Sequence, residues 1–253
     1  ELEAGSGSSI MGYAVICSPN VQNNSDAHFN YVNIRDVADN IKNGPSSSCA
    51  QITTLANAAP VADAGLDYTV PKSTAFVLEG SATDVDGTAS LTYNWSQNDP
   101  EPAPGNGQPQ PTWVDGPLYR SILPTSSPKR YMPKLSDVIA GNLTPTWEVT
   151  PSVGRELNFA FTVRDNANTF ANGIGQTDTD MMKVTVANNA GPFVVTSQNQ
   201  SGITWNVGSS QTITWDVANT DVAPVSANEV DILLSIDGGQ NFNQVIAQNQ
   251  PNT

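Results

Sequence analysis

The strongest constraint on the fold is an alternation of apolar with small or polar residues that recurs along most of the chain beyond residue 57. In the clearest case, apolar side chains occupy every second position from Leu157 to Val163. A period of two places such side chains on one face of a β-strand. Further candidate strands lie at residues 67–70, 75–80, 91–95 and 181–186. Short strands separated by turn residues predict a mainly β fold built from antiparallel β-sandwiches.

The predicted sandwich has one large aromatic core residue and one long interruption. Trp95 is the bulky side chain expected in the core. Residues 97–153 form a proline-rich insertion, and a stretch of that length is not expected to be structureless within a compact domain. We expect residues 135–140 to form a short helical turn. We also expect Trp113 and Trp147 to pack back onto the sandwich.

The first 57 residues lack this alternation and contain the predicted helix, at residues 34–42. Apolar side chains fall on one face at helical spacing, at Ile34, Val37, Ala38 and Ile41. Asn33 suits the N-cap, and Gly44-Pro45 suits the end of the helix.

These patterns divide the chain into three predicted units. Residues 1–57 form a small segment with one helix, and residues 58–190 form a sandwich that carries the insertion at about 97–153. Residues 191–253 contain predicted strands at 193–196, 211–215 and 230–235. Because an immunoglobulin-like sandwich needs about 100 residues, we expect this last unit to be partial or completed from elsewhere.

The charge balance excludes several classes of partner. The chain has 24 acidic and 10 basic residues, for a net charge of -14, which disfavours nucleic acid and anionic lipid. No apolar run reaches the roughly 18–20 residues that span a bilayer. The low share of charged residues, with many turn formers, is typical of extracellular β-rich proteins, so we predict a secreted protein. Cys17 and Cys49 flank the helix and are predicted to form a disulfide.

The start of the chain shows no secretion signal. Glu1-Leu2-Glu3 has neither a basic region nor an apolar core, and no Met begins the sequence. We therefore expect the complete protein to contain sequence upstream of Glu1.

The segment from Gly7 to Ala14 reads Gly-Ser-Ser-Ile-Met-Gly-Tyr-Ala. It resembles the Met-turn of the metzincin clan of zinc proteases, and the flanks resemble the bacterial reprolysin-like branch most. The resemblance implies that Met11 lies beneath three zinc-bound histidines as a soft apolar floor. It also implies that Tyr13 approaches the zinc or donates a hydrogen bond to the oxyanion that forms during hydrolysis. The alternative is that Met11 and Tyr13 are ordinary core residues.

The chain departs from this family at the zinc site. Metzincins carry His-Glu-x-x-His-x-x-Gly-x-x-His, whereas this chain has a single histidine, His28, which follows the Met-turn. The resemblance therefore places the zinc ligands in an upstream catalytic half of the same protein. Residues 1–253 alone are expected not to hydrolyse peptides. His28 is expected to be a hydrogen-bonded surface residue.

Three segments downstream resemble a PKD-like sandwich: residues 60–65, 78–87 and 93–95. The chain departs from that pattern in its long insertion and in lacking a glycine and aspartate cluster after Trp95. Modules of this kind often follow the protease domain of secreted bacterial enzymes.

Two further motifs concern loops. Asp84 and Asp86, with Asp165 or with Asp178 and Asp180, are candidate ligands for calcium, which needs six to eight oxygens. The alternative is that residues 84–87 form a hairpin turn, since Asp and Gly tolerate tight backbone geometry. Residues 235–242 resemble an Asp-box hairpin, in which the aspartate braces the turn.

Two functions remain from the sequence. The first is a non-catalytic C-terminal portion of a secreted zinc metalloendopeptidase, with sandwich domains that bind a protein or polysaccharide substrate. The second is an extracellular adhesion or binding module unrelated to proteolysis. A glycosidase has little support, because no pair of carboxylates stands out among the many acidic loop residues.

Overall fold

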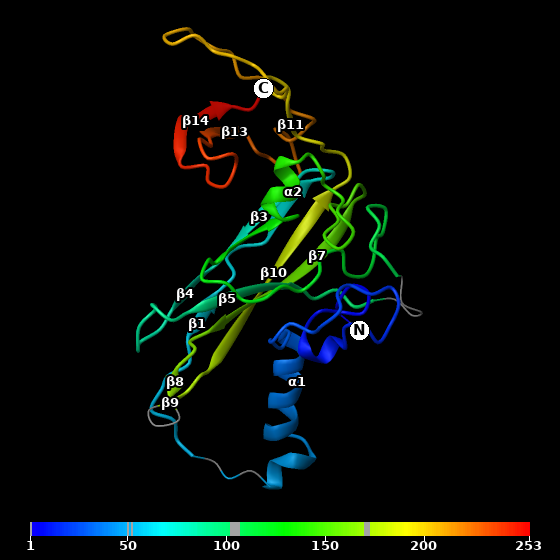
Figure 1. Ribbon diagram of the computed structural model, residues 1–253, viewed down its shortest axis with the longest axis vertical. Helices are drawn as coiled ribbons and strands as arrows, with labels where there is room; N and C mark the ends of the chain where they lie inside the picture. Colours follow the sequence, from blue (N-terminus) through cyan, green and yellow to red (C-terminus); the bar gives the residue numbers. More distant parts are fainter. Residues whose placement is uncertain (1, 50, 52, 102–106, 170–172) are drawn as a thin grey trace.

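The fold is built around a four-stranded sheet. The computed structural model describes residues 2–49, 51, 53–101, 107–169 and 173–253. The strand order is β2 (Tyr68–Pro71), β10 (Thr177–Ala187), β7 (Arg155–Arg164) and β5 (Thr92–Gln97). The long strands β7 and β10 run through the middle of the molecule (Figure 1). The mainly β prediction is confirmed, with one difference: β2 pairs parallel to β10, whereas the other pairs are antiparallel.

A second layer completes the sandwich. In it β1 (Val61–Asp63) pairs with β4 (Ser81–Thr83), and β3 (Phe76–Glu79) pairs with β6 (Lys129–Met132), both antiparallel. Leu78 and Met132 of this layer share one buried core with residues of β7. A small pair, β8 (Asn168–Thr169) and β9 (Gly173–Ile174), extends the β7–β10 hairpin.

The alternation in β7 produces the core as predicted. Leu157, Phe159, Phe161 and Val163 are all fully buried. The Trp95 ring lies 4.6 Å from the Phe161 ring, and Tyr93 stacks on Phe161 at 5.7 Å. The chain passes so close to this cluster that a Cβ at Gly80 would come within 2.5 Å of the Phe161 ring. Only glycine therefore fits between β3 and β4.

The insertion is an integral part of the sandwich. It supplies β6, the helical turn α2 (Leu135–Ile139) that the sequence predicts, and core residues such as Leu118 and Tyr119. Trp113 packs against the core, as expected. Trp147 differs from the expectation, because its ring lies against the N-terminal segment: a Cβ on Gly5 would be 2.8 Å from it.

A buried ion pair fastens the insertion. Arg130 Nη2 donates to Glu148 Oε1 at 2.6 Å, and the two side chains are 5% and 11% exposed. Arg130 Nη1 also donates to the Trp95 carbonyl, at 2.5 Å, and Glu148 Oε2 accepts from the Lys134 amide at 2.8 Å. One arginine thus links β6, β5 and the end of the insertion.

The predicted helix is present as α1 (Tyr31–Lys42). It begins three residues earlier than predicted, after Asn30, and ends before Gly44, whose amide donates to the Asn40 carbonyl at 3.1 Å. The short turns η1 (Ile10–Gly12) and η2 (Pro45–Cys49) lie before and after it. No helix in the described part of the chain is long and apolar enough to cross a bilayer.

The predicted disulfide is not formed in the structure. Cys17 and Cys49 are both free and exposed. Figure 1 shows α1 leading away from the N-terminal segment that holds Cys17. At 1.5 Å per residue the 12-residue helix is about 18 Å long, and Cys49 follows it. The spacing of the cysteines did not reveal this separation.

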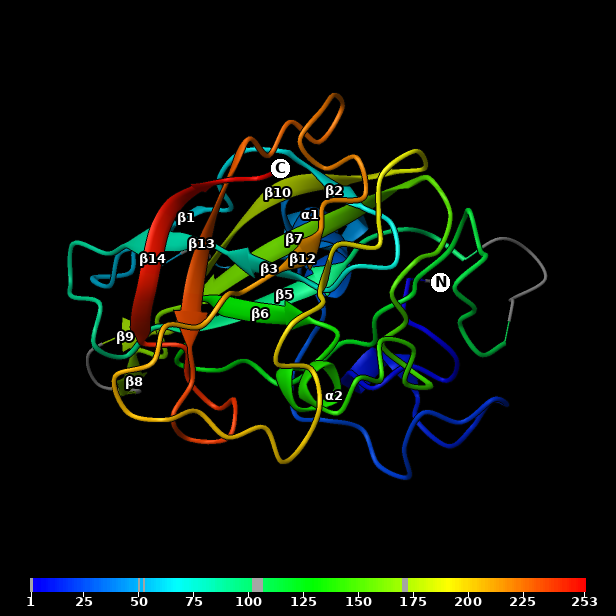
Figure 2. The same ribbon diagram turned by 90° about the horizontal axis from the view of Figure 1, so that it is seen from above.

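Residues 191–253 form two hairpin-like pairs. β11 (Val194–Val195) pairs with β12 (Trp215–Asp216), and β13 (Glu229–Leu234) pairs with β14 (Gln244–Pro251). The prediction of a strand at residues 211–215 is wrong except at Trp215, because β12 begins at that residue. Figure 2 shows β13 and β14 side by side at one edge of the molecule.

Candidate functional site: the Met11 turn

The Met11 segment is a tight, exposed turn. Residues Ile10–Gly12 form η1, which the Gly12 amide closes by donating to the Ser9 carbonyl at 3.0 Å. Tyr13 follows with φ 58°, a left-handed conformation that costs a non-glycine residue strain. Met11 is 47% exposed and Tyr13 55% exposed. Neither side chain belongs to the core of the described structure. The alternative that Met11 and Tyr13 are core residues is therefore wrong.

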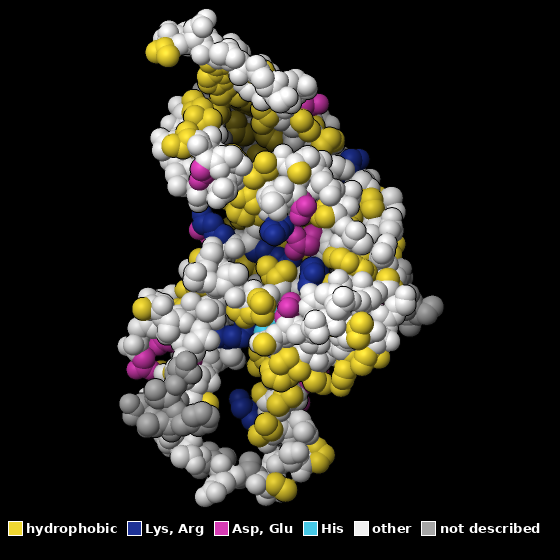
Figure 3. Space-filling model, in the orientation of Figure 1, with side chains coloured by type: hydrophobic (Ala, Val, Ile, Leu, Met, Phe, Trp, Pro, Cys, Tyr) yellow, Lys and Arg dark blue, Asp and Glu magenta, His cyan; other side chains and the backbone are white. Residues whose placement is uncertain are grey.

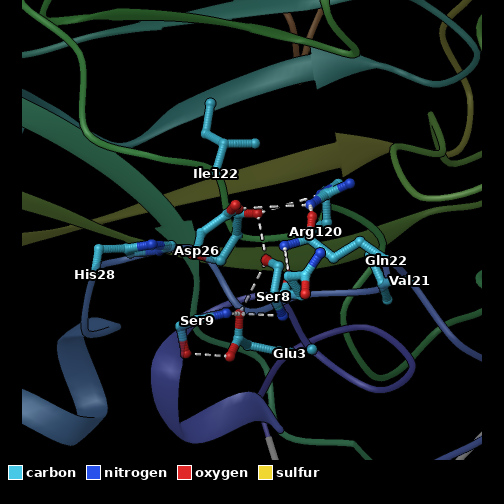
Figure 4. Close-up of polar contacts among 12 residues, drawn as sticks. Glu3, Ser8, Ser9, Val21, Gln22, Asp26, His28, Arg120 and Ile122 are labelled. Atoms are coloured by element: carbon cyan, nitrogen blue, oxygen red, sulfur yellow. Dashed lines mark hydrogen bonds and ion pairs between the residues drawn. The ribbon is translucent and has the colours of Figure 1, made fainter. Parts of the chain in front are cut away.

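A buried carboxylate braces this turn from below. Glu3 Oε1 accepts from the amides of Ser8 and Ser9 at 3.2 and 3.1 Å, and Glu3 Oε2 accepts from Ser9 Oγ at 2.5 Å (Figure 4). Glu3 is only 7% exposed. A Cβ on Gly12 would lie 2.7 Å from Glu3 Oε2. The turn and its carboxylate therefore form one closely fitted unit.

Polar contacts dock this unit on the insertion. Ser8 Oγ donates to the Ser121 carbonyl at 2.6 Å, and His28 Nε2 lies 2.9 Å from Ser121 Oγ. Arg120 lies 3.8 Å from Asp26 and also donates to Gln22. Figure 4 shows Ser8, Gln22, Asp26 and Arg120 close together.

A second arginine joins the docking contacts from β7. Arg164 Nη2 donates to the Phe29 carbonyl at 2.8 Å. Burial lowers the pKa of Arg164 to about 10. Residues 2–30 are therefore held to the sandwich mainly by polar groups.

His28 is buried, at 5% exposure, and is not the surface residue that the sequence suggested. Burial lowers the pKa of its imidazole, and the nearby Arg164 lowers it further, whereas Glu3 and Asp26 oppose the shift. Nδ1 has no hydrogen-bond partner among the described residues. The imidazole thus acts as a neutral link between two segments far apart in the sequence.

The lowered pKa of His28 leads to a pH prediction. Since the unfolded chain binds a proton near pH 6.5 and the folded chain does so only at lower pH, stability is retained above 6.5 and lost as the pH falls below it. We expect His28→Gln to lose less stability than the wild type between about pH 7 and about pH 5. Urea denaturation at several pH values measures the free energy of unfolding of the wild type and of His28→Gln. Identical pH profiles for the two proteins would reject this role of His28.

An exposed apolar surface lies beside the turn. We call it the apolar ledge, and it consists of Ile10, Met11, Tyr13, Val15 and Ile16, which are 40–71% exposed. On α1, Val37 and Ile41 are also exposed. Figure 3 shows hydrophobic side chains gathered over the lower part of the molecule, where these segments lie. Apolar residues such as Val15, Ile16 and Ile41 are expected from the sequence to pack on the sandwich or on a neighbouring molecule. In the described structure they do not pack on the sandwich, because the docking contacts use the polar side of the segment. Packing on a neighbouring molecule stays a prediction.

The described residues do not fit a zinc site. Zinc in such proteins needs three or four nitrogen or sulfur ligands close together. His28 is buried and hydrogen-bonded to Ser121, and both cysteines are exposed and separate. Within the part of the chain that the structure describes, no three His, Cys, Asp or Glu side chains are grouped to hold a metal ion.

The candidate calcium ligands instead accept hydrogen bonds from the backbone. Asp178 and Asp180 accept from the amides of Ala62 and Ala64, both at 2.9 Å, and so join β10 to β1. Asp165 Oδ1 accepts from the Gln176 amide at 2.8 Å.

Asp84 and Asp86 share one turn. Asp84 Oδ1 accepts from the Asp86 amide at 2.8 Å, and Asp86 Oδ2 accepts from the Ala58 amide at 2.7 Å. The Gly87 amide donates to the Asp84 carbonyl at 3.2 Å, which closes a turn. The turn is not a hairpin, because β4 pairs with β1 and β5 pairs with β7. Calcium binding stays a prediction.

The Asp-box segment has the expected bracing geometry. Asp237 Oδ1 accepts from the Asn241 amide at 2.9 Å and from Ser235 Oγ at 2.7 Å. Hydrogen bonds from Asn241 lower the pKa of Asp237 to about 2. These contacts fix a hairpin loop and indicate a structural role.

The sequence indicates the Met11 turn but not the residues that hold it in place. Glu3, Ser121, Arg120 and Arg164 carry no local motif, and the one signal available for Glu3 was its place shortly before two adjacent serines. Comparisons of this chain with protein-family models, with curated proteins and with solved structures found no match.

Proposed function

We propose that this chain is the non-catalytic C-terminal portion of a secreted zinc metalloendopeptidase. The observation that supports this function is the Met11 turn. Glu3 holds its backbone rigidly, while Met11 and the rest of the apolar ledge remain uncovered. An exposed apolar surface of this kind is typical of a contact with another polypeptide segment. The segment that fits is an upstream catalytic half carrying the zinc ligands.

In this proposal the sandwich supports the catalytic half through the Met11 turn. It also contributes to binding of a protein or polysaccharide substrate. The polar contacts of Ser121, Arg120 and Arg164 set the position of the Met11 turn relative to the sandwich. The exposed phenol of Tyr13 then lies at the boundary between the two halves, where it can donate a hydrogen bond to a developing oxyanion.

The test uses the intact polypeptide, including the sequence encoded ahead of Glu1. That sequence is expected to contain His-Glu-x-x-His-x-x-Gly-x-x-His, and its absence would reject the proposal. In the intact enzyme, Tyr13→Phe is expected to lower kcat for peptide hydrolysis by about 100-fold with little change in KM, since one transition-state donor is lost. Tyr31→Phe, on α1, is the matched control and should leave kcat unchanged.

A binding module unrelated to proteolysis is the second candidate. A cavity of about 450 Å³ between β5 and the part of the insertion that includes β6 supports it, and Tyr93, Leu123, Tyr131 and Lys134 are among its lining residues. Aromatic and cationic side chains in one cavity suit a polar ligand with an apolar face. This candidate replaces the first if no zinc-binding motif precedes Glu1.

A further inference from the structure

The third unit lacks a core of its own. Residues 191–253 are all described, and none of their apolar side chains is buried. By contrast, five apolar side chains of β7 alone are fully buried in the sandwich. A folded domain normally encloses such residues, because removing apolar surface from water is the main favourable term in folding.

The uncovered side chains face a common groove. A cavity of about 510 Å³ lies between the two strand pairs, and its lining includes Val195, Trp205, Trp215, Ile232 and Ile246. Val195, Trp205 and Ile246 are 49%, 42% and 46% exposed. Side chains of both strand pairs therefore form one continuous apolar surface, whereas scattered exposed residues would need no explanation.

The strands around the groove also have free edges. Among the described strands, β12 pairs only with β11, and β13 only with β14. Isolated two-stranded pairs are marginally stable in water, and an immunoglobulin-like sandwich uses about 100 residues. The open groove and the free edges both indicate that strands are missing from this unit.

We propose that the groove is the seat of at least one further β-strand of the same polypeptide, lying outside residues 1–253. Its apolar side chains, at every second position, fill the groove, and its backbone pairs with a free edge. The inference does not depend on the proposed protease function. It concerns only how the third unit is completed.

The negative charge of residues 191–253 restricts which residue types the added strand can present to them. Residues 191–253 contain no Lys or Arg. Their acidic residues are Asp216, Asp221, Glu229, Asp231 and Asp237. We therefore expect neutral or basic residues at the polar positions of the added strand. The same charges disfavour a second copy of this unit as the occupant, because two copies bring like charges together.

The path of the backbone supports a strand of the same polypeptide. Asn252, after β14, is only 1% exposed. Its Oδ1 accepts from Nε1 of Trp215, a groove residue, at 2.9 Å, and its Nδ2 donates to the Ala227 carbonyl at 2.7 Å. The chain leaving β14 is thus held at the wall of the groove.

The test compares residues 1–253 with the polypeptide extended by the sequence encoded after Thr253. Ile246→Asp is the informative variant, because Ile246 is half exposed in the open groove and enclosed once a strand is present. In the extended protein this change is expected to lower the melting temperature of the third unit by about 10 °C, since it buries an unpaired charge. In residues 1–253 it should have almost no effect. Val207→Asp is the control, since Val207 is fully exposed and outside the groove.

A second measurement covers the case in which the extended variant does not fold. Residues 1–253 should bind the dye ANS, and a synthetic peptide of the next encoded apolar-alternating strand should displace the dye and raise the melting temperature. The absence of such a strand from the coding sequence would overturn the proposal, as would equal effects of Ile246→Asp in both proteins. A dimer of residues 1–253 that Ile246→Asp dissociates, seen by sedimentation, would assign the groove to a second copy instead.

Discussion

Glu148→Leu is expected to destabilise the protein by about 3–5 kcal/mol, because it leaves the buried Arg130 guanidinium without its counter-charge. Arg130 is 5% exposed and donates to Glu148 at 2.6 Å. The Lys134 amide loses its acceptor in the same variant. The free energy of unfolding from urea denaturation measures the loss.

The control for Glu148→Leu is the double variant Arg130→Met, Glu148→Leu. It removes the uncompensated charge, so it should recover about 2 kcal/mol relative to Glu148→Leu alone. The recovery is expected to be partial, since the Trp95 and Arg120 carbonyls lose the donor that Arg130 provided. If the double variant is less stable than Glu148→Leu, the buried charge is not the cause of the loss.

Phe161→Ala is the second change with a large expected effect, about 3–5 kcal/mol from lost burial and the cavity left behind. Phe161 is fully buried between Tyr93 and Trp95, and Gly80 closes the space above its ring. The rigid surroundings leave little room to collapse into the cavity. Urea denaturation again gives the free energy.

Phe242→Ala is the matched control for Phe161→Ala, because it removes the same side chain from a position that is 39% exposed. In residues 1–253 it should cost less than about 1 kcal/mol. Comparable losses for the two variants would mean that the core is not centred on β7 and its aromatic neighbours.

The strands that sequence reasoning found are those whose core face is made only of apolar residues. In β10 buried and more exposed residues alternate from Met181 to Val186. In β7 the apolar residues alternate with small or polar ones, but residues 159–163 are all buried. β6 was missed because its buried face holds Arg130 next to Met132, so that a charged residue occupies a core position. β14 was missed because it is rich in Gln and mostly exposed. In both, tertiary contacts decide the structure rather than local pattern.

The candidate site shows the same division. The Met11 turn was recognised from its own residues, since Gly, Ser and Met at this spacing are a local signal. The buried location of His28 was not predicted, because its hydrogen-bond partner Ser121 is 93 residues away in the sequence. Likewise, Arg164 and Phe29 are 135 residues apart. No local pattern predicts contacts between segments so distant.

The parallel pairing of β2 with β10 has a consequence for how the protein is made. Ala62 and Asp178, which join β1 to β10 just before this pairing, are 116 residues apart in the sequence. At about 5–20 residues per second of synthesis, the first strands wait on the order of ten seconds for β10 to emerge. During that time β2 lacks its partner strand, although β1 can pair with β4, and β3 with β6, as they emerge. Folding of the sandwich is therefore expected to follow translation of residue 187, and a chaperone that shields nascent edges should raise its yield.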